Sequence, residues 1–577
     1  MSTLWLLHVL FRLLLTEPRQ PHQAESISPF TAAAKKFEPF AVVLLLFVSY
    51  LQFFHQLGTL GLVGPDEPRY AQVAREMVAS GDFVTPRLHG IPWFEKPTLY
   101  YWLAASAFEA MGVSGLAARL PSAVAGLLGV FAVYLIGRHW VSARCGLAAA
   151  LILATSPLYF SLARAASTDM LLTSALTVSL ACIYFAWFGR KQKYGAQVVL
   201  TNRSSVFIHG TYVFLALAIL AKGPVGAVLV GSSVAVFGLI TRRWDLLKIL
   251  LRPGAVLSGL AVALPWYWLC YRANGWTFIQ EFLINHNLAR FATDRYQHAQ
   301  PFWFYLAVVF AGFLPWVFQI VPPAWHWLRH EWRGGQSELE LALFWSWALF
   351  PFLFFSFSQS KLPGYVLPIF PALALLAAKQ WDRLWSVGSS SEPLARGQCL
   401  NLYLQACCVV ALGLALPLGE RFLDQGVGVF LPPMRIFLFA IGIGGILMIW
   451  RWKPFALFGI HLLGIGLAVL LITERIGPRL DAVVSCRQLA DVLQRQGFAG
   501  QPVFIYGLSR RVEYGLNFYL NTRTQLIYSE SDATYPAHGD LFLLTGPAVE
   551  AESVLPHARI VAQTQFLDQK IVRMAKR

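Results

Sequence analysis

The sequence predicts a polytopic α-helical membrane protein that carries a small α/β domain at its C-terminal end. Of its 577 residues, 56% are hydrophobic and 13% are charged, and the mean hydropathy is +0.54. A soluble chain of this length would carry roughly 25% charged residues. Apolar stretches of membrane length recur as far as residue 473, and from Pro478 onward the pattern becomes that of a soluble α/β domain.

Residues 1–38 are predicted to form an N-terminal cytoplasmic tail, because Arg12 interrupts their short apolar stretch and polar residues follow it. Residues 39–477 form the predicted transmembrane domain. A spanning helix needs about 20 apolar residues, and thirteen stretches suit that role. They are residues 39–57, 117–138, 146–164, 170–189, 206–221, 223–241, 254–272, 302–322, 339–358, 363–379, 402–418, 431–450 and 454–473. The shorter apolar run Leu99–Met111 is predicted to be a helix in the membrane interface.

The charges predict an orientation. The net charge is +16, from 46 basic and 30 acidic residues, and much of the basic excess lies in alternate loops, such as that of Arg242 and Arg243. The positive-inside rule assigns these loops to the cytoplasm and the C-terminus to the outer side. Anionic lipid phosphates, rather than nucleic acid, are therefore the expected partners. The seven cysteines show no metal-ligand spacing.

The first outer loop, residues 58–116, gathers charges of both signs in a chain that has few of them elsewhere. Charged groups collected in one loop of a membrane protein indicate a functional site. Asp66 or Glu67 could cap a helix that runs to Ala79. On that helix Asp66, Arg69 and Tyr70 lie three and four residues apart, so they share a face. The alternative is a solvated amphipathic helix whose charges only pair with one another.

Two motifs in this loop, DEPRYAQVAREMVASGDFVTPRLHG and FEKPTLYYWL, resemble the first external loop of bacterial aminoarabinose transferases. Those enzymes belong, with the protein O-mannosyltransferases, to the GT-C superfamily of glycosyltransferases. The resemblance implies a GT-C fold, a key carboxylate at Asp66, and an inverting transfer from undecaprenyl phosphate. The particular reaction that the resemblance favours is transfer of 4-amino-4-deoxy-L-arabinose to a phosphate of lipid A. Pro65 and Thr98 depart mildly from the family pattern.

Two further outer loops hold candidates. Asp169 follows Arg164 between two predicted spans, and it is either a helix cap or a second catalytic carboxylate, a role that the resemblance favours. Lys222 lies in the tight turn before Gly223 and Pro224, where it could meet a lipid phosphate or extend to the membrane surface.

The second large outer loop, Trp276–Gln300, contains His286 and Arg290, which would share a helix face. Arg290 is predicted to bind an anion. His286 could be structural, or it could form a divalent-metal site with Glu95. No other cofactor is expected.

The stretch from Ser358 to Tyr365 resembles the SKLP-x-Y motif of the same family. Lys361 and Tyr365 are therefore predicted to line the cavity, and the alternative is a pair of interfacial anchors.

Residues 478–577 are predicted to form a C-terminal periplasmic α/β domain, with helices over Ser485–Gln496 and Arg511–Leu520. The predicted strands are Val503–Tyr506, Gln525–Tyr528, Leu541–Thr545 and Arg559–Gln563. Its role is interpreted as structural or as docking of the acceptor.

Together these features predict a monomeric glycosyltransferase of the cell inner membrane whose active site faces the periplasm. The predicted catalytic residues are Asp66, Asp169 and Glu95; the predicted substrate-binding residues are Arg69, Tyr70, Lys96, Lys222, Arg290, Lys361 and Tyr365. The alternatives are a related polyprenyl-phosphate-sugar transferase with another glycan, lipid or protein acceptor, and a transporter of lipid-linked sugars. A transporter usually shows internal repeats and charges at mid-membrane, and this sequence shows neither.

Overall fold

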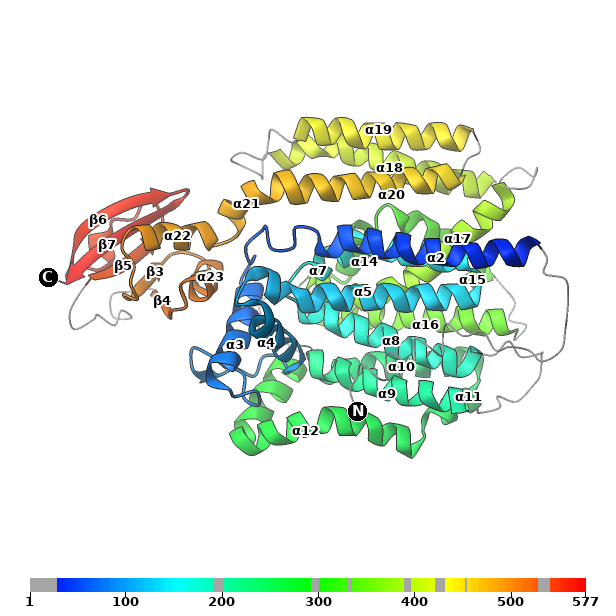
Figure 1. Ribbon diagram of the computed structural model, residues 1–577, viewed down its shortest axis with the longest axis horizontal. Coiled ribbons are helices and arrows are strands. Elements are labelled where there is room, and N and C mark those ends of the chain that lie inside the picture. The colour runs from blue at the N-terminus through cyan, green and yellow to red at the C-terminus, as the bar shows by residue number, and fades with distance from the viewer. Residues whose placement is uncertain are drawn as a thin grey trace.

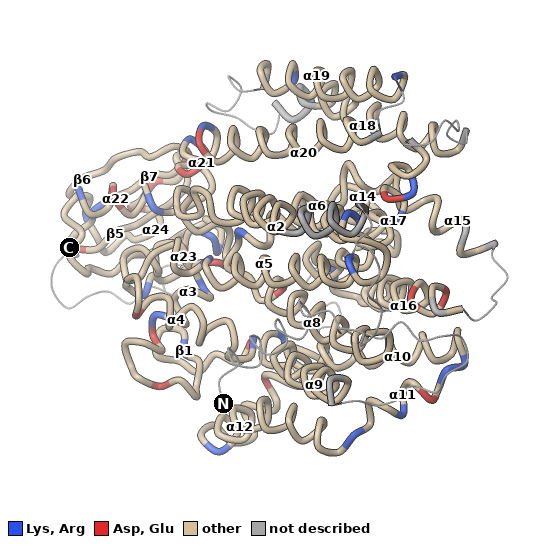
Figure 2. The backbone as a smooth tube through the Cα atoms, turned by 45° about the vertical axis from the view of Figure 1, so that its right-hand side comes forward, with Lys and Arg blue, Asp and Glu red and all other residues tan. Residues whose placement is uncertain are grey.

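Long helices lie side by side in a bundle, with a small sheet domain at one end of it (Figure 1). The computed structural model describes residues 29–189, 202–289, 291, 300–329, 335–388, 396–420, 431–451, 454–527 and 540–576. Figure 2 shows that the long helices are mostly uncharged along their length and that charged residues gather near the ends of the bundle. This distribution is typical of a protein whose middle section lies in a membrane.

Each of the thirteen predicted spans is largely helical. Their elements are α2 (Pro29–Ser49) with η1 (Tyr50–Phe54), α5 (Gly115–Trp140), α6 (Ala143–Thr155) with α7 (Pro157–Ala163), α8 (Thr168–Phe188), α9 (Asn202–Lys222), α10 (Val225–Thr241), α12 (Pro253–Phe278), α14 (Phe304–Gly312) with η3 (Trp316–Ile320), α16 (Gln336–Phe357), η4 (Pro363–Ile369) with α17 (Phe370–Gly388), α18 (Arg396–Glu420), α19 (Leu431–Trp450) and α20 (Pro454–Leu471). Among the described residues, eight helices are long and apolar enough to cross a membrane, or up to ten if each of two bent pairs is one span. The count of thirteen stays a prediction.

Two of the stretches predicted as continuous spans are broken. The axes of α6 and α7 differ by 68°, and the helix pair Phe304–Gly312 and Trp316–Trp325 bends by 107°. Pro157 occupies the first turn of α7 and Pro315 precedes η3. Proline has no backbone N–H and so removes one hydrogen bond of the helical ladder, and each break falls beside one.

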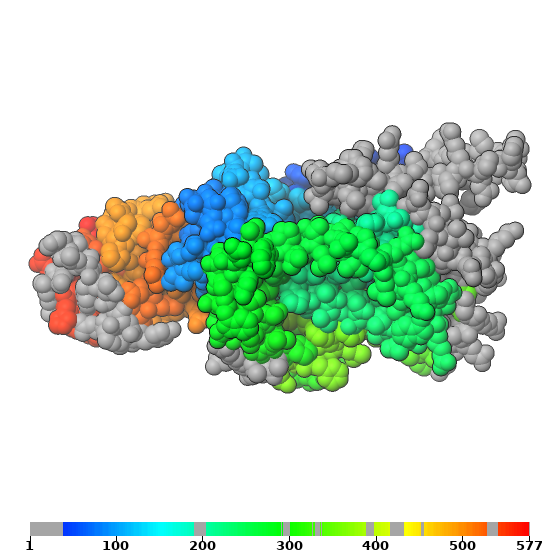
Figure 3. All heavy atoms as spheres, turned by 90° about the horizontal axis from the view of Figure 1, so that it is seen from below, coloured from blue at the N-terminus to red at the C-terminus, as the bar shows by residue number. Residues whose placement is uncertain are grey.

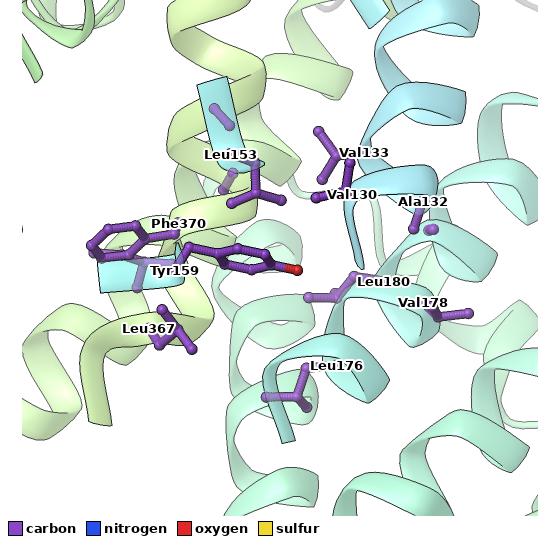
Figure 4. Close-up of a cluster of buried hydrophobic side chains, with 14 of the residues drawn as sticks. Val130, Ala132, Val133, Leu153, Tyr159, Leu176, Val178, Leu180, Leu367 and Phe370 are labelled. Atoms are coloured by element: carbon purple, nitrogen blue, oxygen red, sulfur yellow. The ribbon is translucent and has the colours of Figure 1, made fainter. Parts of the chain in front are cut away.

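The core of the bundle is closely packed around Tyr159 (Figure 4). This side chain is fully buried, and its hydroxyl donates a hydrogen bond to the carbonyl oxygen of Gly126, at 2.8 Å. A Cβ atom at Gly129 would lie 2.3 Å from the same hydroxyl. A larger residue at position 129 would therefore separate α5 from α7, close to the loop that carries Asp169.

The first outer loop is a compact unit of α3 (Asp66–Ser80), the hairpin strands β1 (Arg87–Leu88) and β2 (Ile91–Pro92), and α4 (Leu99–Met111). Gly81 ends α3 with φ 68°, a left-handed conformation that glycine adopts readily. His89 and Gly90 form the hairpin turn with φ 56° and 76°. The predicted helix that runs to Ala79 and the short apolar helix Leu99–Met111 are both present.

The C-terminal domain is a mixed sheet between helices. Its elements are α21 (Gly477–Val484), α22 (Arg487–Arg495), β3 (Val503–Tyr506), α23 (Arg510–Leu520), β4 (Thr524–Ile527), β5 (Asp540–Thr545), α24 (Ala551–Val554), β6 (Ala558–Phe566) and β7 (Gln569–Lys576). The strand order is β4-β3-β5-β7-β6, with β3 parallel to both of its neighbours. All four predicted strands are present, although Tyr528, the last residue of the second, lies outside the described residues. Strand β7 was not predicted from the sequence, although its pairing with β5 completes the sheet.

The C-terminal domain is joined to the first outer loop, and Figure 3 shows the two in contact. The Gly61 amide donates to the carboxylate of Asp481 at 2.6 Å, and the same carboxylate pairs with Arg487 at 2.7 Å. Arg75 donates to the carbonyl oxygen of Phe518 at 2.9 Å. The two outer parts of the chain therefore lie on the same side of the bundle.

Candidate active site

Asp66 and Glu67 open helix α3, but neither caps it as predicted. Pro65 is the N-cap residue and no side chain accepts a capping hydrogen bond there. Both acids lie in the first turn, where the helix dipole favours negative charge. Their surroundings differ: the Asp66 side chain is 55% exposed, whereas that of Glu67 is 9% exposed. Only Asp66 is open to a ligand.

Glu67 is held in a buried ion pair with Arg119 of α5. The guanidinium donates to both carboxylate oxygens, at 3.0 and 2.6 Å, and also to three carbonyl oxygens of residues 57–61. Glu67 further accepts from the backbone amides of Val63 and Ala166, each at 2.6 Å. A buried ion pair is favourable only where its geometry is good and its remaining hydrogen bonds are satisfied, as they are here. It fixes the start of α3 against the loop that carries Asp169. Sequence reasoning missed this pair, although an arginine inside a predicted span was a signal.

Arg69 lies at the centre of the first cluster of charged residues. Its guanidinium contacts Asp66 at 2.5 Å and Glu95 at 3.0 Å, and the ammonium group of Lys96 lies 3.3 Å from the other oxygen of Glu95. Burial disfavours the charged guanidinium, but the charges of Glu95 and other neighbours outweigh it, so the pKa of Arg69 lies above its ordinary value. Four of the predicted site residues, Asp66, Arg69, Glu95 and Lys96, therefore lie in one cluster.

Aromatic rings surround this cluster. Arg69 lies 5.4 Å from the ring centroid of Tyr70, 5.6 Å from that of Trp93 and 5.4 Å from that of Tyr514. Tyr70 is buried, and burial with the nearby negative charge of Asp66 raises its pKa well above the ordinary value. Tyr70 therefore packs beneath the cluster as a neutral phenol. Its contact with substrate stays a prediction.

Three buried polar atoms around the cluster have no hydrogen-bond partner among the described residues. They are Nε of Arg69, Nε1 of Trp93 and the hydroxyl oxygen of Tyr101. A buried donor without a partner is unfavourable by about 1–3 kcal/mol. A substrate with phosphate and hydroxyl oxygens would satisfy such donors. Trp93 and Tyr101 were not predicted as site residues.

A second cluster joins Asp169, Lys222 and Tyr365. Ser167 caps α8, so the predicted capping role of Asp169 is wrong, and the Asp169 carboxylate instead pairs with the ammonium group of Lys222. That ammonium group also lies 4.2 Å from the ring centroid of Tyr365. A Cβ atom at Gly364 would lie 2.8 Å from an oxygen of Asp169. Glycine at position 364 therefore lets η4 approach this carboxylate.

Lys361 does not join either cluster through the contacts that the structure gives. Its ammonium group donates to the carbonyl oxygens of Ser358 and Gln300, at 2.6 and 2.9 Å. These bonds hold the turn before η4, and the predicted lining of the cavity by Lys361 stays a prediction. Tyr365, four residues further on, is the member of this motif that reaches the second cluster.

The second large outer loop is described only in part. His286 is half-buried in η2 (Ile279–Ala289), and Arg290 lies outside the described residues. No group of three His, Cys, Asp or Glu side chains that could hold a metal ion occurs in the described part of the chain. The metal pair of Glu95 and His286 and the anion-binding role of Arg290 stay predictions.

A family model described as dolichyl-phosphate-mannose-protein mannosyltransferase matches residues 40–283, which include the first outer loop, Asp169 and Lys222. Together with the helical bundle and with the relatives and solved structure described next, this match shows a membrane glycosyltransferase of the GT-C class that uses a lipid-linked sugar donor.

More specific relatives are also similar. The undecaprenyl phosphate-alpha-4-amino-4-deoxy-L-arabinose arabinosyl transferase of Edwardsiella ictaluri is 32% identical over 458 residues, which cover 75% of this chain and 77% of the relative. The corresponding transferase 2 of Sodalis glossinidius is 30% identical over 436 residues, which cover 74% of this chain and 76% of the relative. The chain belongs to this family of arabinosyl transferases. The crystal structure of ArnT from Cupriavidus metallidurans bound to undecaprenyl phosphate has a TM-score of 0.74 and 25% identity, covering 92% of this chain and 97% of that one.

Proposed function

We propose that this protein transfers 4-amino-4-deoxy-L-arabinose from undecaprenyl phosphate to a phosphate group of lipid A, at the periplasmic face of the inner membrane. The observation that carries the proposal is the charged cluster of Asp66, Arg69, Glu95 and Lys96. It lies in the first outer loop of a chain that is 32% identical to an undecaprenyl phosphate-alpha-4-amino-4-deoxy-L-arabinose arabinosyl transferase over 77% of that relative's length.

The donor is a lipid-linked phosphate, and its recognition needs fixed cations. Arg69 and Lys96 supply two of them in the first cluster, and Lys222 supplies a third in the second cluster. Undecaprenyl phosphate is the ligand named for the Cupriavidus metallidurans structure. As the bond between the sugar and the phosphate breaks, negative charge develops on the departing phosphate. Cations held in place before the reaction stabilise this charge and so lower the barrier.

In the transfer, an oxygen of the acceptor phosphate attacks the anomeric carbon from the face opposite the donor phosphate. The carbon–oxygen bond to the donor phosphate breaks, its electron pair stays on that oxygen, and the configuration at the anomeric carbon inverts. The attacking oxygen is already anionic, so no general base is required. Asp66, 2.5 Å from the Arg69 guanidinium, would orient that cation, and Glu95 would do the same for Lys96 as well as Arg69.

A hydroxyl acceptor would change the role of Asp66. An alcohol loses its proton as it attacks, and the exposed Asp66 carboxylate could accept that proton as a general base. The acceptor therefore decides between the two mechanisms.

The test is transfer by the purified protein in lipid bilayers. Undecaprenyl-phosphate-linked aminoarabinose and lipid A are supplied, and mass spectrometry measures the lipid A product. The expected result is lipid A that gains one aminoarabinose and depends on the donor. Transfer to another glycan, lipid or protein, with none to lipid A, would contradict the proposed acceptor. Movement of intact donor across the bilayer without transfer would indicate a transporter instead.

A further inference from the structure

Helix α23 of the C-terminal domain has two apolar faces, and each packs in a different hydrophobic core. Val512 and Leu516 are buried in the core of the sheet domain. Phe518 is buried in the core of the transmembrane domain, and Tyr514, four residues earlier, packs against that same core. Residues four apart share a helix face, so Tyr514 and Phe518 together point toward the first outer loop. This helix links the two domains through side chains as well as backbone contacts.

Tyr514 reaches the centre of the first charged cluster. Its ring centroid lies 5.4 Å from the guanidinium carbon of Arg69. The other two rings near this cation, Tyr70 and Trp93, belong to the first outer loop itself. The side chain of Arg69 is 12% exposed. Tyr514 thus helps to enclose Arg69 from the side of the C-terminal domain.

We infer that Tyr514 is a positioning residue for the transfer reaction, holding the Arg69 guanidinium against Asp66 and Glu95 where the donor phosphate binds. The inference rests on the proposed function. A cation within about 6 Å of an aromatic face is attracted by roughly 0.5–2 kcal/mol, more strongly where water is excluded. The attraction restrains the guanidinium, and small displacements of a catalytic group reduce turnover strongly. The C-terminal domain therefore contributes to the active site and does more than cover it.

The test compares three proteins. Tyr514→Phe keeps the ring, whereas Tyr514→Leu keeps an apolar side chain on α23 and removes the ring. We expect Tyr514→Leu to lower kcat roughly 3- to 30-fold. Tyr514→Phe keeps the ring but loses the hydroxyl, which also interacts with Arg69, so its kcat should lie between those of the Leu variant and the wild type. In an Arg69→Ala background the Leu substitution should have no further effect, because the two residues act together. Wild-type kcat in Tyr514→Leu, or an equal loss in the Phe and Leu variants, would overturn the inference.

Tyr519→Phe is the matched control on the same helix. It removes the hydroxyl that accepts from the Leu62 amide at 2.7 Å, a contact between the domains that does not involve Arg69. It should lower the melting temperature and keep kcat. If the melting temperature of Tyr514→Leu is lower than that of the wild type, a series of fluorinated phenylalanines at position 514 replaces this variant. Fluorination keeps the shape of the ring and weakens its attraction for a cation. A kcat that falls with fluorination supports the inference, and a constant kcat overturns it.

Binding of undecaprenyl phosphate, measured beside turnover, separates two kinds of failure. Wild-type protein that binds this lipid and transfers no sugar to lipid A would overturn the proposed function. Wild-type protein that transfers the sugar, with the position 514 variants equally active, would overturn the role of Tyr514 alone.

Discussion

Adjacent residues of like charge have opposite roles in this protein. Glu67 is buried and uses its two oxygens on Arg119 and on two backbone amides, so its carboxylate holds the outer loop in place. Asp66 is half-exposed and contacts the cation at the centre of the first cluster. Substitution of Asp66 should therefore lower turnover, whereas substitution of Glu67 should lower stability.

Asp66→Asn should fold normally and lose turnover. The amide keeps the shape of the side chain but removes the charge that orients Arg69, and loss of one preorganised electrostatic contact typically reduces kcat about a hundredfold. Transfer assays with the purified variant measure this effect. Glu109→Gln, which changes an exposed carboxylate on α4, is the control and should stay active. An Asp66→Asn enzyme with wild-type turnover would contradict our placement of the active site.

Glu67→Gln should destabilise the protein. Removing one partner of a buried ion pair leaves the other charge uncompensated, which is unfavourable by about 3–5 kcal/mol. The melting temperature in detergent should fall, whereas that of Asp66→Asn should change little. The double variant Glu67→Gln with Arg119→Met removes both charges and should recover part of the loss. A Glu67→Gln protein as stable as the wild type would show that the pair does not hold the loop.

Sequence reasoning named all four charged residues of the first cluster as site residues, because spacing along one helix and a local motif carried that information. Asp66 and Arg69 are three residues apart, and Glu95 and Lys96 are neighbours. Sequence spacing gave no indication of Tyr514, because its approach to Arg69 depends on how two domains dock. The hydrogen bonds of Lys361 to backbone carbonyls were likewise beyond prediction, since they depend on the path of the turn.

At the scale of elements, the hairpin turn of the first outer loop supports the C-terminal domain. Nε2 of His89 lies 2.9 Å from the side-chain amide of Asn517 on α23. An amide N–H donates to this ring nitrogen only when the nitrogen carries no proton. Burial and the charge of Arg523 lower the pKa of His89 below its ordinary value of 6.5, against the opposing effect of Glu76.

This contact predicts a loss of stability in acid. The folded protein holds the His89 proton less tightly than the unfolded chain, so the unfolded chain binds more protons as the pH falls. The stabilising contribution is present above pH 6.5 and is lost as the pH falls through 6.5 toward the lower pKa of the folded state. The melting temperature should therefore decrease between pH 7 and pH 5.

His89→Asn is the matched variant for this measurement. Asparagine tolerates the left-handed backbone of position 89 and does not titrate. The decrease in melting temperature between pH 7 and pH 5 should be smaller in the variant than in the wild type. Equal decreases in the two proteins would exclude His89 as a source of the pH dependence.

Elements with strong local signals were predicted well. The short apolar helix Leu99–Met111 has the predicted bounds, and strand β3 matches Val503–Tyr506. The breaks after α6 and before η3 were not predicted, because apolar composition continues through them and only a proline marks each one. Strand β7 was missed because its sequence, QKIVRMAK, mixes charged and apolar residues. Pairing with β5 and β6 stabilises it in the folded domain.

At the scale of the whole molecule, the segments that the charges assign to opposite sides of the membrane lie at opposite ends of the bundle. The first outer loop and the C-terminal domain are in contact at one end, and the basic segment around α11 (Trp244–Leu250) lies at the other (Figure 1). Topology reporters fused after Gly90 and after Arg577 should both report the periplasm. A reporter fused after Arg252 should report the cytoplasm. A cytoplasmic signal from the Gly90 fusion would contradict the side that we propose for the reaction.

The bond between Gly61 and Asp481 joins residues that are 420 positions apart in the chain. A ribosome adds about 5–20 residues per second, so the first outer loop emerges roughly 20–80 s before its partner in the C-terminal domain has been made. During that interval only contacts within the early part of the chain, such as the pair of Glu67 and Arg119, can hold the loop in shape. A nascent protein already inserted in the membrane therefore carries an incomplete outer site, and this site is completed only near the end of synthesis.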